Sequence, residues 1–297
     1  MFSNKNSKQK SEALKKILDK DGIISMPGCF DALSAKLIEK EGIEVGFMSG
    51  FSVSSTKLGM PDTGLISFAE MLEQVKNISN ATSIPFIFDG DTGYGNSVNV
   101  YRTVRDYANA GAAGVMIEDQ KWPKKCGHTK GKDVVDIEEA KSRIKAAVDA
   151  SNQNNKDILV MARTDAIATR GLDDAIKRMQ TFSELGADIL FVEAPKNKDE
   201  MTTICKEVPG YKIANIVEGG ITPNLPMKEL TDIGYKLAVY PLTVMSSAMK
   251  AMTDSLNRLM KDEDRSELLL DFKDLRQRVG FDDYYKTSSQ YETSKRN

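Results

Sequence analysis

Eight short apolar runs alternate with longer amphipathic segments along most of the chain. The runs are rich in β-branched and aromatic residues and are the predicted strands, at residues 23–26, 45–48, 85–88, 114–117, 158–162, 189–192, 212–216 and 236–240. Because the runs are continuously apolar and do not alternate with polar residues, each is expected to be buried on both faces, as in a parallel sheet covered by helices.

The segments between these runs carry apolar residues three and four positions apart, which is typical of helices. This spacing predicts helices at residues 31–40, 68–79, 98–110, 137–150, 172–185 and 243–259 and, more weakly, at 199–207 and 227–233. Gly42, Gly111 and Gly186 follow three of them, where helices commonly end. The pattern predicts an α/β fold, namely a closed (β/α)8 TIM-type barrel. Because the sequence shows no linker and no break in composition, we expect a single domain over residues 1–297, with the barrel core at residues 22–262.

The residues after the last predicted barrel helix form an expected helical arm, 263–297. Residues 263–278 are predicted to form an additional helix, and Phe281, Tyr284 and Tyr285 follow it. Aromatic residues of this kind often serve an interface, although they could instead cover the base of the barrel. The polar tail, 287–297, is expected to fray or to contact a partner subunit.

Composition excludes several classes of partner. The 41 basic and 43 acidic residues, with a pI near 5.7, give no electrostatic footprint for nucleic acid or an anionic membrane. Cys29, Cys126 and Cys205 form no CxxC pair, so neither a disulfide framework nor a structural zinc site is expected, and a reducing, cytoplasmic location fits. The N-terminal segment is polar and no run of about 18 apolar residues occurs, so neither export nor membrane spanning is expected.

Polar residues follow six of the predicted strands. They are Ser49-Gly50-Phe51, Asp89-Gly90-Asp91, Glu118-Asp119, Arg163-Thr164-Asp165, Glu193, and Asn215 with Glu218. Any one of these could serve only a turn or a helix cap. Because active sites of barrels lie at the C-terminal ends of the strands, six together predict an active site.

Four of the acidic residues predict a metal site. Asp89, Asp91 and Glu118, together with Asp62 from the preceding turn, would repel one another strongly unless a divalent cation lay among them. Mg²⁺ is the expected ion, because it commonly takes few direct protein ligands and so leaves coordination positions for water and substrate oxygens. Mn²⁺ could replace it. An EF-hand is excluded, because Tyr94 stands where that loop requires glycine.

The segment from Glu118 to His128 combines acids, three lysines, a cysteine and the only histidine of the chain. It is either an active-site loop or a solvated basic loop. A thiol beside positive charge is expected to have a pKa lowered toward neutrality, so Cys126 could exchange a proton with an intermediate. His128 could bind a carboxylate or only order the loop. Arg163 could pair with a substrate carboxylate, assisted by backbone N–H groups of the Ser49-Gly50-Phe51 turn.

Six sequence strings now point to a family. SGFSVSSTKLGMPD, DGDTGYGN, EDQKWPKKCGH, MARTDA, VEAP and ANIVEGG occur in this order, within a resemblance that extends from Gly22 to about Tyr285. The chain resembles the isocitrate lyase and phosphoenolpyruvate mutase superfamily, and KKCGH resembles the signature of its carbon–carbon lyase branch. This resemblance implies a Mg²⁺-dependent barrel, usually a homotetramer with swapped C-terminal helices.

The resemblance also implies a role for each site residue. It places Asp89 and Asp91 near the metal, with Asp62 and Glu118 acting through water, and it places Ser49, Gly50, Phe51 and Arg163 on the substrate carboxylate. It makes Cys126 an acid on a mobile loop, accompanied by Lys124, Gly127 and His128. The other half of the substrate would lie among Glu193, Asn215 and Glu218.

Two departures from the family pattern narrow the expected substrate. Phe47 stands where the isocitrate and methylisocitrate lyases carry a tyrosine, and residues 241–247 lack the arginine found there after the eighth strand. Both differences argue against a tricarboxylate. The Trp122-Pro123 pair and the Glu218-Gly219-Gly220 run are more similar to the dimethylmalate lyase and oxaloacetate hydrolase group, which includes the plant petal death protein.

The function expected from this resemblance is retro-Claisen cleavage of a 2-hydroxy dicarboxylate, of the 2,3-dimethylmalate or 2-methylisocitrate type, to an oxo-acid such as pyruvate and a carboxylic acid. The alternatives are an oxaloacetate hydrolase giving oxalate and acetate, a phosphonopyruvate or phosphoenolpyruvate enzyme, and an oxaloacetate decarboxylase. A barrel that binds metal without catalysis is a remote alternative. The general base stays unassigned.

Overall fold

Eight parallel strands close into a barrel in a computed structural model, which describes residues 6–129, 131–153 and 158–291. The strands are β1 (Ile24–Cys29), β2 (Gly46–Met48), β3 (Phe86–Asp89), β4 (Gly114–Glu118), β5 (Leu159–Thr164), β6 (Ile189–Val192), β7 (Tyr211–Asn215) and β8 (Leu237–Tyr240). Each strand pairs with the next along the chain, and β8 pairs with β1. The prediction of a (β/α)8 barrel and of its eight strands is confirmed.

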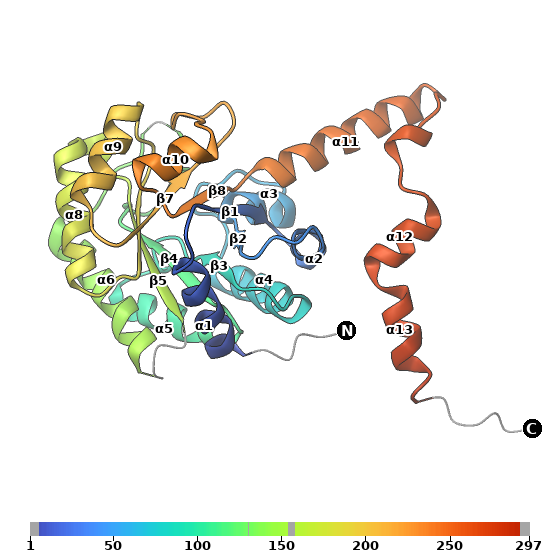
Figure 1. Cartoon of the computed structure of the whole chain (residues 1–297), viewed down its shortest axis with the longest axis horizontal. Coiled ribbons are helices and arrows are strands. Elements are labelled where there is room, and N and C mark those ends of the chain that lie inside the picture. Colours follow the sequence, from blue (N-terminus) through green and yellow to red (C-terminus); the bar gives the residue numbers. More distant parts are fainter. Residues whose placement is uncertain (1–5, 130, 154–157, 292–297) are drawn as a thin grey trace, which may run out of the picture.

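Helices surround the barrel on its outer side (Figure 1). They include α2 (Ala32–Lys40), α4 (Phe68–Ala81), α5 (Ser97–Asn109), α6 (Ile137–Asn152), α8 (Leu172–Glu184), α9 (Lys198–Glu207) and α10 (Met227–Ile233). Each corresponds to a helix predicted from apolar spacing, and the bounds differ by at most two residues. Among the described residues, no helix is long and apolar enough to cross a membrane.

Helix α1 (Ser7–Leu18) was not predicted. Asn6 and Gln9 form a capping box at its start, which satisfies backbone N–H groups that would otherwise lack acceptors. Leu14 and Leu18 are buried together with Met26 and other side chains of the barrel interior. The polar N-terminal segment thus supplies an apolar face that packs against the interior cluster.

Helix α3 (Gly50–Leu58) occupies a segment that was expected to form only a turn. The Ser49 side chain accepts a hydrogen bond from Ser52 N at its start, and Gly59 ends it in a left-handed conformation with φ of 63°. The consequence for the site is that the end of β2 leads directly into the N-terminus of a helix. A further short helix, α7 (Ile167–Arg170), follows β5.

The C-terminal arm begins earlier than residue 263. Helix α11 (Thr243–Met260) leaves the barrel, and Met245 is its only buried residue (Figure 1). The expected single helix over 263–278 is wrong, because the segment divides into the 3₁₀ turn η1 (Ser266–Leu268) and α12 (Phe272–Val279), which Asp271 caps. Helix α13 (Phe281–Ser288) completes the arm.

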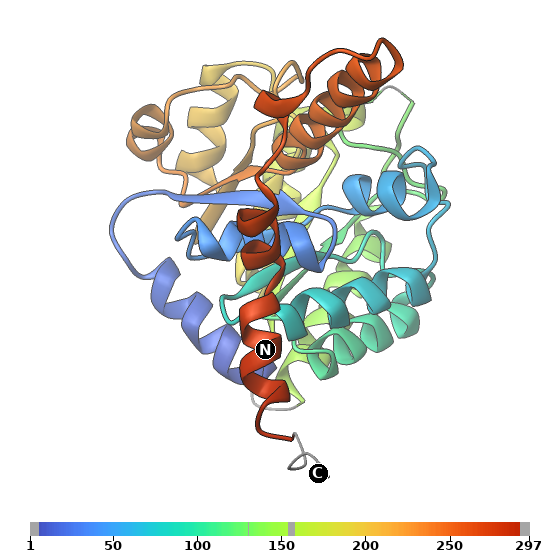
Figure 2. The ribbon, with the colours of Figure 1, turned by 90° about the vertical axis from the view of Figure 1, so that its right-hand side faces the viewer.

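The arm crosses one side of the barrel and touches it lightly (Figure 2). Lys40 Nζ at the end of α2 donates to the carbonyl oxygens of Gln277 and Arg278, at 3.3 and 3.1 Å. Tyr284 and Tyr285 are 56% and 52% exposed, so they do not cover the base of the barrel. Residues 292–297, part of the predicted polar tail, lie outside the described residues.

Candidate active site

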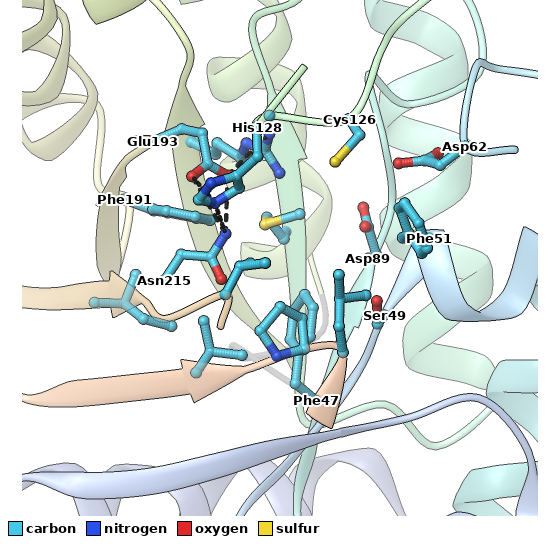
Figure 3. Close-up of a pocket in the computed structure, with 18 of the residues that line it drawn as sticks. Phe47, Ser49, Phe51, Asp62, Asp89, Cys126, His128, Phe191, Glu193 and Asn215 are labelled. Carbon is cyan, nitrogen blue, oxygen red and sulfur yellow. Dashed lines mark hydrogen bonds and ion pairs between the residues drawn. The ribbon is translucent and has the colours of Figure 1, made fainter. Parts of the chain in front are cut away.

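A cavity lies at the C-terminal mouth of the barrel, where the predicted site residues were expected to converge (Figure 3). Its lining includes most of them: Ser49, Phe51, Asp62, Asp89, Lys124, Cys126, Gly127, His128, Arg163, Glu193 and Asn215. Four predicted residues, Gly50, Asp91, Glu118 and Glu218, are not in the lining. Gly50, Asp91 and Glu118 directly contact residues that are.

Lys124 is buried among the acids of the site. Its Nζ lies 2.8 Å from Asp62 Oδ1 and 2.7 Å from Asp91 Oδ1. Burial disfavours the ammonium, but Asp91 and Asp62 outweigh burial and raise the pKa of Lys124 well above its ordinary value. The first lysine of KKCGH is therefore a fixed positive charge beside the acids.

One ammonium does not fully compensate these carboxylates. Burial raises the pKa of Asp91 to about 6 and that of Glu118 well above its ordinary range, despite Lys124 and Arg163 nearby. Neither carboxylate oxygen of Glu118 accepts a hydrogen bond from the described residues. A divalent cation with its waters would supply the missing positive charge and donors, so these residues fit Mg²⁺.

The acids are not close enough for all of them to bind an ion directly. Over the described ranges, no three acid, histidine or cysteine side chains are grouped so that they could hold one metal ion. This arrangement suits Mg²⁺, which commonly keeps several waters and takes one or two carboxylates.

Helix α3 directs its N-terminus at the same acids. Gly50 N donates to Asp89 Oδ2 at 3.1 Å, and a Cβ on Gly50 would lie 2.6 Å from that oxygen. Glycine is therefore required for the close approach, and the helix dipole favours negative charge at this point. The Gly50 N–H is bound to Asp89 and does not face the cavity.

Arg163 lies at the end of β5 and contacts three carboxylates. Its Nε and Nη2 donate to Asp165 at 2.9 and 3.1 Å, and Nη2 lies 3.1 Å from Glu193 Oε2. Nε also lies 3.4 Å from Glu118 Oε2. Among the described residues no hydrogen bond of Nη1 is found, and Arg163 is one of the residues that line the cavity.

Cys126 reaches the cavity from the loop between β4 and α6, whose described residues 121–129 and 131–133 we call the KKCGH loop. Figure 3 shows its sulfur pointing into the cavity, between Asp62 and His128. The expected lowering of its pKa is wrong. Burial raises the pKa of the Cys126 thiol above its ordinary value, and Arg163 only partly opposes this effect. Cys126 is therefore a neutral thiol at physiological pH.

His128 connects the KKCGH loop to two other parts of the barrel mouth. Its Nδ1 accepts a hydrogen bond from Ile221 N at 3.0 Å, so Nε2 is the ring nitrogen that is directed at Glu193. Nε2 lies 3.3 Å from Glu193 Oε1, and Asn215 Nδ2 donates to both Glu193 oxygens, at 3.2 and 3.1 Å (Figure 3). Glu193 thus receives hydrogen bonds from loop and strand together.

The prediction that Glu218 lines the cavity is wrong. Glu218 is exposed and accepts a hydrogen bond from Thr243 Oγ1 at 2.5 Å. Its side chain therefore lies at the start of α11 and not beside Glu193. The carboxylate was counted because it follows a strand, but two residues separate it from the end of β7 and allow it to turn outward.

The remaining lining residues of the cavity are mostly apolar. They are Phe47, Met116, Met161, Phe191, Ile213, Val217, Val239, Pro241 and Leu242. The basic residues of the lining are Lys124, Arg163 and His128, and the guanidinium of Arg163 lies over the Phe191 ring, 5.2 Å from its centroid. The cavity therefore offers a ligand both charged and apolar contacts.

Two buried groups behind the cavity were not singled out from the sequence. Lys132 pairs with Asp165, and Arg178 pairs with Asp119 at 3.0 Å. Asp119 also accepts hydrogen bonds from Thr164 Oγ1 and Asp165 N. Lys132 and Arg178 both lie on segments whose sequence around them is typical of solvent-exposed residues. Only the folding of the chain brings them to Asp165 and Asp119.

Comparisons with known proteins match this chain over nearly its whole length. The family described as phosphoenolpyruvate phosphomutase matches residues 14–260. The chloroplastic carboxyvinyl-carboxyphosphonate phosphorylmutase of Arabidopsis thaliana is 41% identical, over 93% of this chain and 83% of that protein. The 2,3-dimethylmalate lyase of Eubacterium barkeri is 40% identical, over 95% of this chain and 98% of that protein.

Solved structures are also similar to this chain over nearly its whole length. An oxaloacetate acetylhydrolase in complex with 3,3-difluorooxalacetate is similar with a TM-score of 0.92 at 27% identity, covering 98% of this chain and 100% of that one. A phosphonopyruvate hydrolase in complex with oxalate and Mg²⁺ is similar with a TM-score of 0.84 at 30% identity, covering 95% and 99%.

Proposed function

Because the chain belongs to the phosphoenolpyruvate mutase and isocitrate lyase superfamily, we propose that it is a Mg²⁺-dependent carbon–carbon lyase that cleaves a 2-hydroxy dicarboxylate. One observation carries the proposal: Cys126, a neutral thiol, points into a cavity that also contains Arg163 and the acids around Lys124. This arrangement places a proton donor opposite groups suited to hold an anionic substrate.

The charged side of the cavity binds the oxo-acid half of the substrate in this proposal. Arg163, together with Ser49 and Phe51 at the start of α3, binds its carboxylate, whereas the Gly50 N–H stays bound to Asp89. Asp89 and Asp91 would hold Mg²⁺, with Asp62 and Glu118 acting through water. The bound ion would supply positive charge that stabilises negative charge on substrate oxygens.

The apolar side selects the substituents. Val239, Pro241 and Leu242 present no positive charge to a third carboxylate, whose burial without a partner would be costly. Methyl groups fit such a wall. We therefore favour a dicarboxylate of the 2,3-dimethylmalate type over 2-methylisocitrate.

The reaction begins when the C2 hydroxyl loses its proton to a base that is not yet assigned. Phe47 has no hydroxyl to serve in that role. The C2 oxygen becomes a carbonyl, the C2–C3 bond breaks, and its electron pair remains on C3 as an enediolate. Cys126 then donates its S–H proton to C3, so that an oxo-acid such as pyruvate and a carboxylic acid are released.

The residues beside Cys126 position it. Lys124 joins the KKCGH loop to Asp62 and Asp91, while His128 joins it to Ile221 and Glu193. We assign His128 to ordering the loop, because both of its ring nitrogens contact protein groups. Each contact favours the position in which the thiol faces the substrate.

Three other activities are alternatives for this site. Oxaloacetate hydrate is itself a 2-hydroxy dicarboxylate, and the oxaloacetate acetylhydrolase structure supports hydrolysis to oxalate and acetate as the second candidate. Phosphonopyruvate or phosphoenolpyruvate chemistry would follow the phosphorylmutase relative, and decarboxylation of oxaloacetate is a further alternative. The KKCGH sequence favours carbon–carbon bond cleavage over phosphorus chemistry, but it does not separate the lyase from the hydrolase.

Product analysis tests the proposal. The protein is incubated with Mg²⁺ and separately with 2,3-dimethylmalate, 2-methylisocitrate, citramalate and oxaloacetate, and pyruvate and oxalate are measured independently. Pyruvate from 2,3-dimethylmalate supports the lyase, whereas oxalate from oxaloacetate supports the hydrolase. Phosphorus NMR of a phosphonopyruvate incubation covers the third alternative. Failure with every compound would favour a barrel without catalysis.

The arm supports an oligomer as part of the proposal. Met249, Met252, Leu256 and Leu259 lie three or four residues apart on α11 and are each more than half exposed. We propose that α11 packs on a second copy of the chain, in a homotetramer with exchanged C-terminal helices. A cytoplasmic location stays a prediction from the sequence.

A further inference from the structure

Hydrogen bonds join the two ends of the KKCGH loop at its base. Gln120 and Val134 form an antiparallel bridge, and Lys121 N donates to Asp133 O at 2.8 Å. The Gln120 side chain also exchanges hydrogen bonds with the backbone of Lys125, at 2.8 and 2.9 Å. These bonds fix the base of the loop and Lys125, but none of them reaches the tip of the loop, residues 126–128.

Lys132 connects the tip of the loop to the barrel. Its Nζ donates to the carbonyl oxygen of Gly127 and, at 2.8 Å, to Asp165 Oδ1. The side chain of Lys132 is 3% exposed and that of Asp165 is fully buried. A buried ammonium needs such partners, because each unpaired charge in the interior is costly.

Asp165 is itself held from the barrel side. Its backbone N donates to Asp119 Oδ1 at 3.0 Å, and Asp119 is paired with the buried Arg178. Its carboxylate also accepts two hydrogen bonds from Arg163. Asp165 therefore keeps a charged partner when Lys132 leaves, so the contact with Lys132 can break and form again without stranding a buried carboxylate.

Gly127 shows how closely the tip packs in this position. A Cβ on Gly127 would lie 2.5 Å from both Arg163 Nη2 and Glu193 Oε2. The backbone at Gly127 therefore rests directly on the Arg163–Glu193 ion pair, while its carbonyl binds Lys132. A small displacement of the tip would break the Lys132 contact and withdraw the adjacent Cys126.

We propose that Lys132 is a positioning residue that holds the KKCGH loop closed, by joining the Gly127 carbonyl to Asp165. Lys132 does not line the cavity, so it acts through the loop and not on the substrate. Its consequence for turnover rests on the proposed function, in which the loop delivers Cys126. The closure of the loop itself can be measured without any substrate.

Three variants of the full-length protein test this role. Lys132→Met removes the charge and keeps the length of the side chain, and Lys132→Arg restores the charge. Lys121→Met is the matched control, because Lys121 forms an exposed ion pair with Asp133 in the same loop. Thermal unfolding shows whether each variant is folded.

Two measurements report directly on the loop. Trp122 is the only tryptophan of the chain and its ring lies against Gly64, so quenching of its fluorescence by acrylamide reports on loop displacement. Trypsin cleavage after the buried Lys124, identified by mass spectrometry, reports on opening.

We expect Lys132→Met to increase cleavage after Lys124 by about tenfold or more and to increase quenching of Trp122, because a charge-assisted contact is lost. Lys132→Arg is expected to restore much of the protection, and Lys121→Met to leave both readouts unchanged. With an active substrate, Lys132→Met should lower kcat more than it raises KM.

Several results would overturn the proposal. A folded Lys132→Met protein with unchanged cleavage and quenching would do so, as would an equal effect of Lys121→Met. If Lys132→Met does not fold, Lys132→Gln replaces it, and failure of both to fold would show that Lys132 stabilises the barrel instead. Absence of turnover with altered loop protection would reject only the proposed function.

Discussion

The mouth of the barrel and the C-terminal arm depart from the usual distribution of residues in opposite ways. At the mouth, charged groups such as Lys124, Asp91 and Arg163 are buried. On the arm, apolar side chains such as Met252 and Leu256 are exposed. Buried charge and exposed apolar surface are both unusual in a folded chain, and each indicates a function that the fold alone does not require.

The two regions differ in the kind of partner that each one lacks. The charges at the mouth already have protein partners, but Glu118 and Asp91 remain incompletely compensated, which calls for a cation and a substrate. Most apolar side chains of α11 are exposed, since Met245 is the only buried residue of this helix. A small ligand can complete the mouth, whereas the arm needs a surface as large as another subunit.

Removal of the metal gives the largest expected effect and acts on the mouth alone. Dialysis against EDTA should lower turnover by at least about 10³-fold, because the charge supplied by the cation stabilises the transition state. Mg²⁺ should restore turnover, and Mn²⁺ should do so in part. The oligomer, measured by light scattering, should be unchanged. Full activity after chelation would remove the metal from the account.

Replacement of Cys126 tests the proton donor. Cys126→Ala should lower kcat by about 10² or more, because the enediolate then lacks its acid. Cys205→Ala is the matched control, since Cys205 lies on α9 outside the cavity. Turnover of Cys126→Ala close to that of the unmodified protein would reject the role of the thiol, and so would full activity of Cys126→Ser.

A charged substitution on α11 tests whether this helix mediates the association of subunits, independently of catalysis. Leu256→Lys should weaken association of subunits by about tenfold or more, because it buries an ammonium in an apolar contact. Asn257→Lys adds the same charge at the neighbouring exposed position and should change little. Light scattering over a range of protein concentrations measures both. Equal effects of the two variants would show that the apolar stripe is not the contact.

The pH dependence of alkylation tests the protonation state of Cys126. Because its pKa is raised above its ordinary value of 9.0, the thiol predominates through neutral pH and thiolate accumulates only in alkaline solution. The rate of Cys126 alkylation by iodoacetamide, without metal, should therefore rise about tenfold per pH unit from pH 7 to 9. A plateau near pH 7 would show the lowered pKa that the basic sequence around Cys126 suggested.

Local sequence pattern was sufficient for the barrel. Continuous apolar runs and glycine stops predicted all eight strands and most helices, because in this fold each unit packs against its neighbours in the chain. It failed for α1 and α3, whose capping residues, Asn6 and Ser49, lie in polar segments without a clear apolar period. It also failed at Asp271, a capping residue that begins α12 within an expected continuous helix.

The candidate site was predictable as a set of strand ends, but not as a set of contacts. Position after a strand correctly brought Arg163, Glu193 and Asn215 to one cavity, yet it misplaced Glu218 by ignoring how the chain turns. The sign of the Cys126 pKa shift depends on burial, which charge in the sequence does not reveal. Lys132 could not be assigned, because its partner Asp165 lies 33 residues away.

Cleavage of 2,3-dimethylmalate in D₂O tests the central claim most directly. Proton donation from Cys126 to one face of C3 predicts pyruvate and propionate with a single deuterium at C2 of propionate, in one configuration, as measured by NMR and mass spectrometry. Cys126→Ala should lose this product. Absence of both products, or the same stereospecific labelling at an unchanged rate in Cys126→Ala, would contradict the account.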